Sequence, residues 1–594
     1  MFSEWLDSHS LSDALVPGAG LPWPPAGDPA WQALPAASLE EVRALAAAYR
    51  EQPYPTCTAT QFLAFSRTGD RRAWENPYFF RRRKLIAAVL GCCVGENDLD
   101  AVVDGIWTIC EETSWVISAH NASSREEPRP LPDITNPCID LFAAQTAMIL
   151  SITCHLLESR LDAVTPLLTR RIRAEIGRRI LTPFATRDDY WWMGFLRHDL
   201  NNWTPWIVSN VFYTVVAMEG EPFRRRELLS RGLRMLDRWL AVLPEDGGCD
   251  EGAGYWNMAG GSLLDALELL EQVTGGRMCF REDPKVRNIL MFPLKARLRN
   301  GWFVNFADCD ARPLLSGERL QRAGEMLEEP ALVAAGNALR GTLADQINDT
   351  PHFNRLLSLL FHPVAQTKPD TPARDWWLPD LQLRVLEKGR LILVAKGGHN
   401  GENHNHNDVG SFMLYADGEP VIVDAGNMVY TAKTFSDERY SLWNVRSCWH
   451  NLPIIGGCEQ LPGSEYRAEA AVPAEDGMTV SFASAYGPQA GVQRCERTLS
   501  LSEAALALTD TIALAAPLPV TWVLLMREKP ELIGKCCRTG PVIFEIPKGL
   551  SASVEEKPVT DPRMARSFPG SLWRFTLTGT PDTAHFLSLS FTLL

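Results

Sequence analysis

Apolar residues recur every three or four positions across residues 38–360, a spacing typical of amphipathic helices. Examples are Leu39, Val42 and Leu45, and later Leu228, Leu229, Leu233, Leu236 and Leu240. Turn-forming pairs separate the predicted helices, namely Gln52-Pro53, Asn76-Pro77, Asn136-Pro137, Gly275-Gly276 and Asp283-Pro284. Consecutive helical hairpins of this kind either close into an incomplete ring, an α/α toroid, or pack as an irregular bundle, and periodicity alone leaves both open.

The pattern changes around residues 369–379, where prolines and Trp376-Trp377 precede segments that alternate with a period of two. Strands are predicted at 381–386, 391–396, 412–415, 421–424, 479–485, 496–501, 505–516, 520–526 and 572–578. An antiparallel β-sandwich is the simplest interpretation. The expected fold is therefore multidomain α and β, with a helical domain over residues 1–375 followed by a sandwich over residues 376–594.

Composition is that of a globular protein, with 46% hydrophobic and 22% charged residues. A chain of 594 residues is too long for a single core, in agreement with two domains. The formal charge of −14 argues against a nucleic-acid or membrane-surface binder, because such proteins need a basic face. An anionic partner would require a local basic cleft.

The longest apolar stretches, such as Leu85–Val94, are about half as long as the roughly 20 residues that a membrane span requires. Residues 1–23 lack a basic start followed by an apolar run, so a cytoplasmic location is expected, or a periplasmic or secreted one if a signal has been removed. The 14 cysteines show no CxxC spacing and are expected to be reduced.

The segment GGHNGENHNHND at residues 397–408 concentrates His399, His404 and His406 within a few positions. In an extended chain His404 and His406 project to the same side. Imidazoles with a carboxylate are typical ligands of a divalent metal, and His450 is a candidate to complete the set. The alternative is a polar turn whose histidines hydrogen-bond to the backbone.

Five further motifs stand out, namely HNHND at 404–408, GSF at 410–412, VDAG at 423–426, NNWTPW at 201–206 and DGGCDEGAGY at 246–255. Together these motifs resemble the heparinase II/III family of polysaccharide lyases. The resemblance implies an α/α toroid followed by an antiparallel β-sandwich, which agrees with the division that periodicity gives. It also implies cleavage of a uronate-containing anionic glycan by β-elimination.

The resemblance assigns roles to particular residues. Tyr255 would act as the acid and often also as the base, while Asn202 and His404 would neutralise the uronate carboxylate, as donors do in an oxyanion hole. The implied metal ligands are His406, Asp424 and His450. The ion would be zinc, or else manganese or calcium, with a structural role, because β-elimination needs no activated water.

One position departs from the family pattern, since several relatives have a histidine where this chain has Trp203. His198 would share a face with Asn202 if the segment were helical, and otherwise Tyr255 performs both proton transfers. Tyr430 is a further candidate for proton transfer or sugar positioning, with packing as the alternative.

Further substrate contacts are expected from Asn201, Trp203, His399 and from stacking by Trp115, His120 and Trp206, although core packing is an equal alternative for the tryptophans. The basic run 81–84 either attracts a polyanion or forms a solvated helix face.

The expected partner is an anionic polysaccharide or oligosaccharide. Glycosaminoglycans such as hyaluronan, chondroitin or heparan sulfate are favoured over alginate. No nucleic-acid or membrane partner is expected, and a homodimer stays open. Two other functions remain. A glycoside hydrolase would use Asp246, Asp250 or Glu251 as paired carboxylates, and a non-catalytic glycan-binding protein would retain the metal as a staple.

Overall fold

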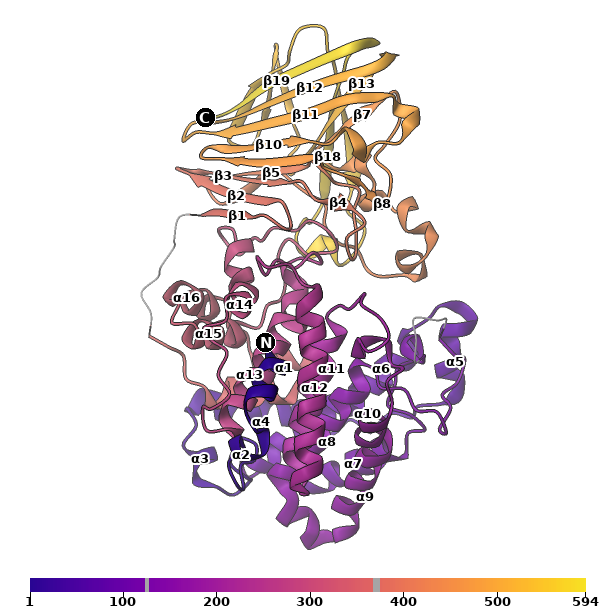
Figure 1. The fold of residues 1–594 in the computed structure, drawn as a ribbon, viewed down its shortest axis with the longest axis vertical. Coiled ribbons are helices and arrows are strands. Elements are labelled where there is room, and N and C mark those ends of the chain that lie inside the picture. The colour runs from indigo at the N-terminus through magenta and orange to yellow at the C-terminus, as the bar shows by residue number, and fades with distance from the viewer. Residues whose placement is uncertain (123–127, 367–373) are drawn as a thin grey trace. The chain divides into compact units, whose positions relative to one another are not determined.

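A computed structural model describes residues 1–122, 128–366 and 374–594. The chain divides into two compact units, one helical and one rich in β-strands (Figure 1). The helical unit comprises Met1–Leu243, Asn257–Asp283 and Ser316–Pro369, and the sandwich unit comprises Pro244–Trp256, Pro284–Leu315 and Asp370–Leu594. Two segments that precede the strands in sequence thus belong to the sandwich unit. The boundary expected at residues 375–376 stays a prediction.

The helical unit is built from helices separated by short turns. They are α1 (Phe2–Ser8), α2 (Leu11–Ala14), α3 (Pro29–Gln32), α4 (Ala36–Arg50), α5 (Ala59–Thr68), α6 (Arg72–Cys93), α7 (Leu99–Glu111), η1 (Ser118–His120), α8 (Leu141–Val164), α9 (Pro166–Ile176), η2 (Gly177–Leu181), α10 (Thr182–Thr186), η3 (Trp191–Met193), α11 (Trp203–Met218), α12 (Pro222–Val242), α13 (Gly260–Val273), α15 (Gly317–Met326), α16 (Pro330–Ala338), α17 (Leu343–Asp349) and α18 (Phe353–Phe361).

Local signals set several helix ends. The Asp140 carboxylate accepts a hydrogen bond from the Ala143 amide at 2.7 Å and caps α8. Thr165 caps α9, whose first residue is a proline. The predicted break at Asn76-Pro77 is wrong, because Pro77 lies inside α6. Pro77 lies beyond the first turn, so its missing N–H removes one backbone hydrogen bond without ending the helix.

Helix α8 is long and apolar enough to cross a membrane by length and composition alone. Its most apolar 18-residue window has a mean hydropathy of 1.4, but 83% of that window is buried inside the protein. Helices α6, α9, α11 and α18 pack against it. Burial of this kind is typical of a core helix.

The sandwich unit contains helix α14, the start of η4 and all the strands. Its elements are η4 (Ala253–Met258), α14 (Pro284–Ala296), β1 (Asp375–Leu378), β2 (Leu383–Lys388), β3 (Leu391–Lys396), β4 (His399–Asn400), β5 (Phe412–Ala416), β6 (Glu419–Ile422), η5 (Ala432–Phe435), η6 (Asp437–Ser441), η7 (Trp443–Val445), η8 (Ser447–Trp449), β7 (Pro453–Ile455), β8 (Gly463–Arg467), β9 (Ala470–Ala474), β10 (Gly477–Ser481), η9 (Ala483–Ala485), η10 (Pro488–Ala490), β11 (Val492–Leu501), β12 (Ala505–Leu518), β13 (Val520–Met526), β14 (Glu531–Ile533), β15 (Cys536–Thr539), β16 (Val542–Glu545), β17 (Ser551–Pro558), η11 (Met564–Arg566), β18 (Ser571–Thr578) and β19 (Asp582–Leu593).

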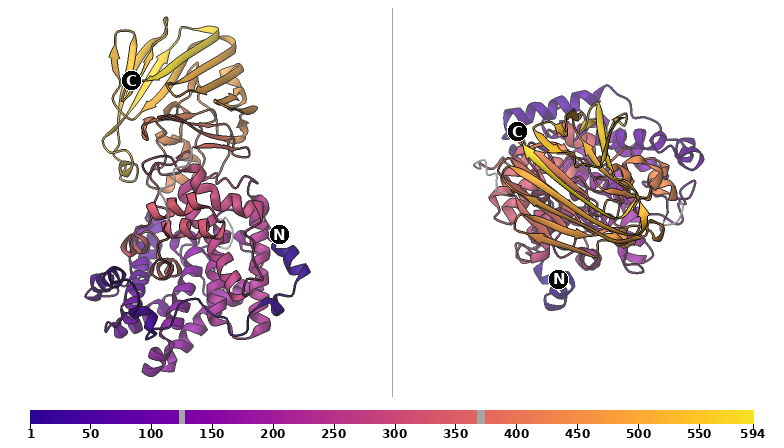
Figure 2. Two further views of the ribbon diagram at one scale, coloured as in Figure 1. Left: turned by 90° about the vertical axis from the view of Figure 1, so that its left-hand side faces the viewer. Right: turned by 90° about the horizontal axis from the view of Figure 1, so that it is seen from above.

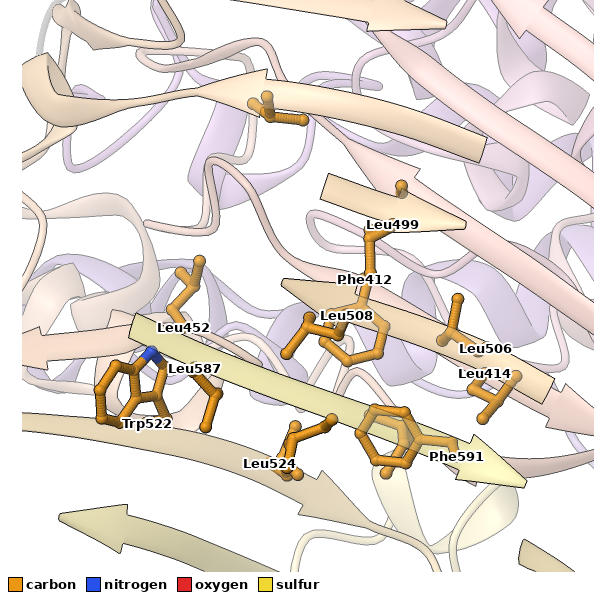
Figure 3. Packing of buried hydrophobic residues seen from close by; sticks show 14 of the residues in the cluster. Phe412, Leu414, Leu452, Leu499, Leu506, Leu508, Trp522, Leu524, Leu587 and Phe591 are labelled. Atoms are coloured by element: carbon orange, nitrogen blue, oxygen red, sulfur yellow. The ribbon is translucent and has the colours of Figure 1, made fainter. Parts of the chain in front are cut away.

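Two antiparallel sheets form the layers of this unit, which Figure 2 shows from two further sides. One sheet runs β1-β2-β3-β5-β6-β13-β18-β17, with β7 also paired to β13, and the other runs β14-β15-β16-β19-β12-β11-β10-β9. Leu414 and Leu524 of the first sheet pack against Leu508 and Phe591 of the second (Figure 3). The alternation of buried residues along β12 explains why the period of two identified the sandwich.

The two early segments are fixed to the sandwich by polar contacts. One Asp246 carboxylate oxygen accepts a hydrogen bond from the Asp380 amide at 2.8 Å. The Asn305 amide donates to the Asp424 carbonyl oxygen at 2.9 Å, just after β6. These contacts bring the loop before η4 and the loop after α14 to the ends of the central strands.

Candidate active site and metal centre

The imidazole-rich loop, residues 397–411, connects β3 to β5. The buried Lys396 at the end of β3 binds two carboxylates of this loop. The Lys396 ammonium donates to Glu402 and to Asp408, each at 2.7 Å. Burial lowers the pKa of Lys396, but the two carboxylates outweigh burial and raise this pKa above its ordinary value. His404 has a φ of 53°, a left-handed conformation that non-glycine residues rarely adopt and that occurs often at functional sites.

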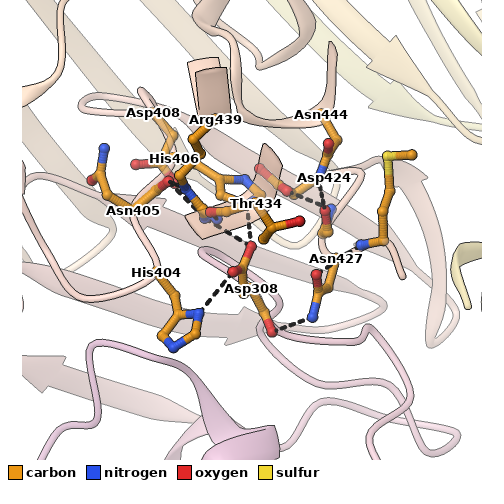
Figure 4. Close-up of polar contacts among 12 residues, drawn as sticks. Asp308, His404, Asn405, His406, Asp408, Asp424, Asn427, Thr434, Arg439 and Asn444 are labelled. Carbon is orange, nitrogen blue, oxygen red and sulfur yellow. Dashed lines mark hydrogen bonds and ion pairs between the residues drawn. The ribbon is translucent and has the colours of Figure 1, made fainter. Parts of the chain in front are cut away.

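Both histidines of the pair meet one carboxylate, that of Asp308 (Figure 4). His404 Nδ1 lies 2.8 Å from Asp308 Oδ2, and His406 Nε2 lies 3.1 Å from Asp308 Oδ1. Arg439 donates to the same Oδ1 at 2.9 Å. Burial opposes ionisation of Asp308, but the two imidazoles and the guanidinium outweigh it and lower the pKa of this carboxyl. Asp308 is therefore the hub of the cluster.

His404 is only 18% exposed, so burial by itself would lower its pKa. The Asp308 hydrogen bond and the Glu251 carboxylate, whose Oε2 lies 4.0 Å from His404 Nε2, outweigh burial and raise the pKa. The protonated form is thus favoured, and a protonated imidazole is suited to bind an anionic group.

The structure brings together His406, Asp424 and His450, whose ligand atoms all lie within 4.8 Å of one another. All three side chains are buried. His406 Nδ1 and His450 Nε2 are buried atoms without a hydrogen-bond partner in the described part of the chain, while His450 Nδ1 contacts Asp424 Oδ2 at 2.7 Å. Two bare imidazole nitrogens beside a carboxylate fit a divalent transition metal.

The surrounding contacts would orient such a ligand set. Asp308 holds His406 through Nε2, which leaves Nδ1 directed to the metal position, as outer-shell carboxylates commonly do. The ion would fix the imidazole-rich loop to the strand end that carries Asp424.

Tyr255 lies on η4, beside His404 and Tyr430. Its ring centroid is 4.9 Å from that of His404, and its hydroxyl is hydrogen-bonded to the Tyr430 hydroxyl. The Tyr430 hydroxyl also lies 3.3 Å from His404 Nδ1. Gly252, with a φ of 86°, makes the turn before Tyr255, and a Cβ there would lie 2.5 Å from the Cβ of Cys309.

Both phenols are protonated near neutral pH. Burial is the main cause that raises the pKa of Tyr255, followed by Tyr430 and Glu251. Burial and Asp308 likewise raise the pKa of Tyr430, whereas the Tyr255 hydroxyl and the Arg563 guanidinium lower it.

Comparison with known proteins identifies part of the chain. Residues 370–529 match the family described as heparinase II/III-like, C-terminal. This segment is similar to the C-terminal domain of that family. It contains His404, His406, Asp424, Tyr430 and His450, so the resemblance in the sequence is confirmed there. No curated protein matches the chain.

Solved structures are similar over almost the whole chain. Heparinase III has 13% identity and a TM-score of 0.62, covering 95% of this chain and 94% of that one. A heparinase III gene product with methylated lysines has 12% identity and a TM-score of 0.61, with 100% and 88% covered. Heparan sulfate lyase HepC from Pedobacter heparinus has 13% identity and a TM-score of 0.57, with 100% and 87% covered. These likenesses concern the fold, and they confirm the predicted helical domain followed by an antiparallel sandwich.

The sandwich unit also contains His399 and the candidate hydrolase carboxylates Asp246 and Asp250. His399 lies on β4, where its Nδ1 accepts a hydrogen bond from the Gly401 amide at 3.1 Å. Asp250 accepts from the Asn403 amide at 3.0 Å and so ties the Tyr255 loop to the imidazole-rich loop. Asp246 and Asp250 are thus engaged with backbone groups, which does not favour their use as paired hydrolase carboxylates.

Asn201, Asn202 and Trp203 lie at the start of α11 in the helical unit. The side-chain Oδ1 of Asn201 accepts a hydrogen bond from the Trp203 backbone amide at 3.1 Å. His198 is exposed in a non-helical segment, so the argument that placed it on one face with Asn202 fails. The role proposed for Asn202 stays a prediction.

The aromatic residues of the helical unit form a continuous row. Ring contacts of 4.6–5.7 Å join, in order, Trp191, Trp203, His120, Phe142, Trp206 and His352. Trp115 is not part of this row. It is 1% exposed, and its indole N–H donates a hydrogen bond to the Ile109 carbonyl oxygen. Its side chain is packed in the core and presents no face for stacking.

Neither interpretation of the basic run at 81–84 is correct. Arg81 and Arg82 are buried in α6 and paired with Glu112, while the Lys84 ammonium donates to backbone carbonyls, including Tyr49 at 2.9 Å. These cations serve packing within the helical unit.

Sequence reasoning missed Asp308 and Arg439. Asp308 lies in the stretch NFADCDAR at 305–312, outside any motif used above, and its contact with His404 spans 96 positions. The sequence contains a weak signal for a polar site, since the otherwise apolar stretch is interrupted by Asn305, Asp308 and Asp310.

Proposed function

We propose that this protein is a polysaccharide lyase that cleaves uronate-containing anionic glycans by β-elimination. The observation that carries the proposal is the cluster of Tyr255, Tyr430 and His404, joined by hydrogen bonds and ring contacts within one unit. It combines two proton-transfer groups with an imidazole whose protonated form is favoured. β-Elimination requires the same combination.

The reaction removes the C5 proton of the uronate and breaks the C4–O4 bond. The C5–H electron pair becomes the C4=C5 double bond, and O4 leaves with a proton. The carboxylate beside C5 must be neutralised first, a role that we assign to His404 and to Asn202. Tyr255, whose pKa is raised, is suited to protonate O4.

We assign the proton acceptor to Tyr430, which must first lose its hydroxyl proton to solvent because both phenols are protonated near neutral pH. The Tyr255 hydroxyl donates to the resulting phenolate, which is why this contact lowers the pKa of Tyr430. The phenolate then takes the C5 proton while Tyr255 protonates O4, and transfer of a proton from Tyr430 to Tyr255 along their hydrogen bond restores the pair. We therefore assign the acid role to Tyr255 and the base role to Tyr430. A bound divalent metal would hold His406 and Asp424, and thereby the loop that carries His404.

The substrate class that we favour is a glycosaminoglycan, with an alginate-like uronan as the alternative on the same site. Purified protein is incubated with hyaluronan, chondroitin sulfate, heparan sulfate and alginate, and ultraviolet absorbance and reducing ends are followed. A lyase raises both, since its product carries a double bond conjugated to the carboxylate. A hydrolase raises only reducing ends, and a binding protein raises neither.

Tyr255→Phe should lower kcat by about 100-fold or more, the usual contribution of general acid catalysis. Tyr415→Phe is the matched control, because Tyr415 is a buried tyrosine of β5 whose hydroxyl has no hydrogen-bond partner in the described residues. It should retain activity. Full activity of Tyr255→Phe would disprove the acid assignment.

A further inference from the structure

An arginine-bearing turn lies beside Tyr430, outside the segment that matches the family. The turn follows β17 and includes η11. One oxygen of Asp561 accepts from the Arg563 and Met564 amides at 2.9 and 3.0 Å, and the other accepts from the Val429 amide at 3.0 Å. Asp561 therefore fixes the turn to the residue that precedes Tyr430.

Arg563 uses one edge of its guanidinium within the protein. Its Nε donates to Asp310 at 2.8 Å, and its Cζ lies 5.3 Å from the centroid of the Tyr430 ring. Among the described residues the Nη groups of Arg563 form no hydrogen bond, and the side chain is 25% exposed. A planar guanidinium with a free outer edge can bind a carboxylate or sulfate with two hydrogen bonds.

A second arginine lies beside Arg563. Arg566 shares the same carboxylate, with its Nη2 3.5 Å from Asp310 Oδ2, and its side chain is 57% exposed. Two guanidinium groups thus share the Asp310 carboxylate, while the oxygens of Asp561, the second carboxylate of this turn, are taken up by backbone amides. The outer edges of the two guanidinium groups are therefore open to a further anion.

We propose that Arg563 and Arg566 form an anion subsite beside the tyrosine pair, which binds a carboxylate or sulfate of the glycan next to the bond that is cleaved. The inference rests on the proposed lyase function and adds to it a determinant of specificity. The shared ligand chemistry is an oxyanion on a sugar ring.

The test is steady-state kinetics of Arg563→Gln, Arg563→Lys and Arg566→Gln with unsulfated hyaluronan and with chondroitin sulfate. Arg494→Gln on β11 is the control for the loss of one exposed positive charge, since Arg494 pairs with Glu496. We expect Arg563→Gln to raise KM about 10- to 100-fold, from the loss of a charge-assisted contact, with kcat changed much less. Arg563→Lys should recover part of the affinity, and Arg566→Gln should raise KM less than Arg563→Gln.

The substrates separate the two sources of the oxyanion. An increase in KM with sulfated chains alone identifies a sulfate, and an equal increase with hyaluronan identifies a carboxylate. A KM for Arg563→Gln within twofold of the control overturns the proposal. So does a fall in kcat without a change in KM, because Arg563 would then act on proton transfer rather than on binding.

Calorimetric titration of a defined acidic oligosaccharide measures the subsite apart from cleavage. It is carried out in a Tyr255→Phe background with and without Arg563→Gln. If the wild-type protein cleaves no uronan, the proposed function fails, but a 10- to 100-fold loss of affinity would still support the anion subsite. Equal affinity of the two variants would refute it.

Discussion

Replacement of Asp308 by asparagine isolates the role of the carboxylate hub. The side chain keeps its size, but it offers one acceptor oxygen where the carboxylate offers two. In the native protein Oδ2 faces His404, while Oδ1 faces His406 and Arg439. One of the two histidines must then face an amide NH₂ group. Whichever orientation the amide takes, one imidazole loses its acceptor, and His406 faces at best a neutral carbonyl oxygen, which is a weaker acceptor than the carboxylate.

The expected magnitude follows from these contacts. Loss of an outer-shell carboxylate from a ligating histidine typically weakens metal binding about 10- to 100-fold, which corresponds to about 1.4–2.8 kcal/mol. Removing the partner of a buried charge also costs stability, on the order of 3 kcal/mol. Arg439 keeps its hydrogen bonds to the carbonyl oxygens of Asn405 and Thr434, so the loss of stability should be smaller than this value.

The assay is calorimetric titration of chelator-stripped protein with Zn²⁺, together with thermal unfolding. Glu387→Gln is the matched control. The Glu387 side chain is 5% exposed, against 2% for Asp308, and it also bridges two basic residues, Arg299 and Arg374. Both variants should melt at lower temperature, but only Asp308→Asn should weaken zinc affinity. Unchanged zinc affinity in Asp308→Asn, or an equal loss in Glu387→Gln, would refute the role of the hub.

Three further changes test other parts of the sandwich unit. Gly252→Ala should reduce activity and melting temperature, since the added Cβ would lie 2.5 Å from the Cβ of Cys309 at a φ of 86°; normal kinetics would show that the turn does not position Tyr255. Chelation of metal should lower the melting temperature, and added Zn²⁺ should restore it; an unchanged melting curve would exclude a structural ion. Burial raises the pKa of Glu402 to about 7, above the value of about 4.3 in an unfolded chain. Between these two pH values the native protein holds a proton that unfolding releases. The contribution of this proton to the free energy of unfolding is complete below about pH 4 and is lost as pH rises through about 7. Glu402→Gln should flatten the fall in melting temperature between about pH 5 and 8, and an unchanged slope would count against the raised pKa.

The fold follows from periodicity where each element buries one face. The predicted strand 391–396 coincides with β3, and the alternation in β12 was read correctly. The assignment of the segments 244–256 and 284–315 to the sandwich unit was not predicted. Their attachment depends on contacts such as Asn305 to the Asp424 carbonyl oxygen, which involve single polar side chains and leave no periodic trace.

The candidate site was predictable where its residues share a motif. His404 and His406 stand together in one short run, and the structure brings both to the same carboxylate. They do so because His404 adopts a left-handed conformation, not through the alternation of an extended strand. Asp308 and Arg563 are single residues far away in sequence, so only the three-dimensional arrangement identifies them.

The net charge of −14 describes the whole chain, whereas the charges around one site depend on how individual groups are paired. Asp308 is shared by Arg439 and two imidazoles, and Asp310 is shared by Arg563 and Arg566. Each carboxylate therefore faces more than one group able to carry positive charge. Since exposed charges beyond about 8 Å are largely screened at physiological salt, the arrangement of the nearby charged groups, rather than the net charge of the whole chain, sets the potential that a bound anion would meet.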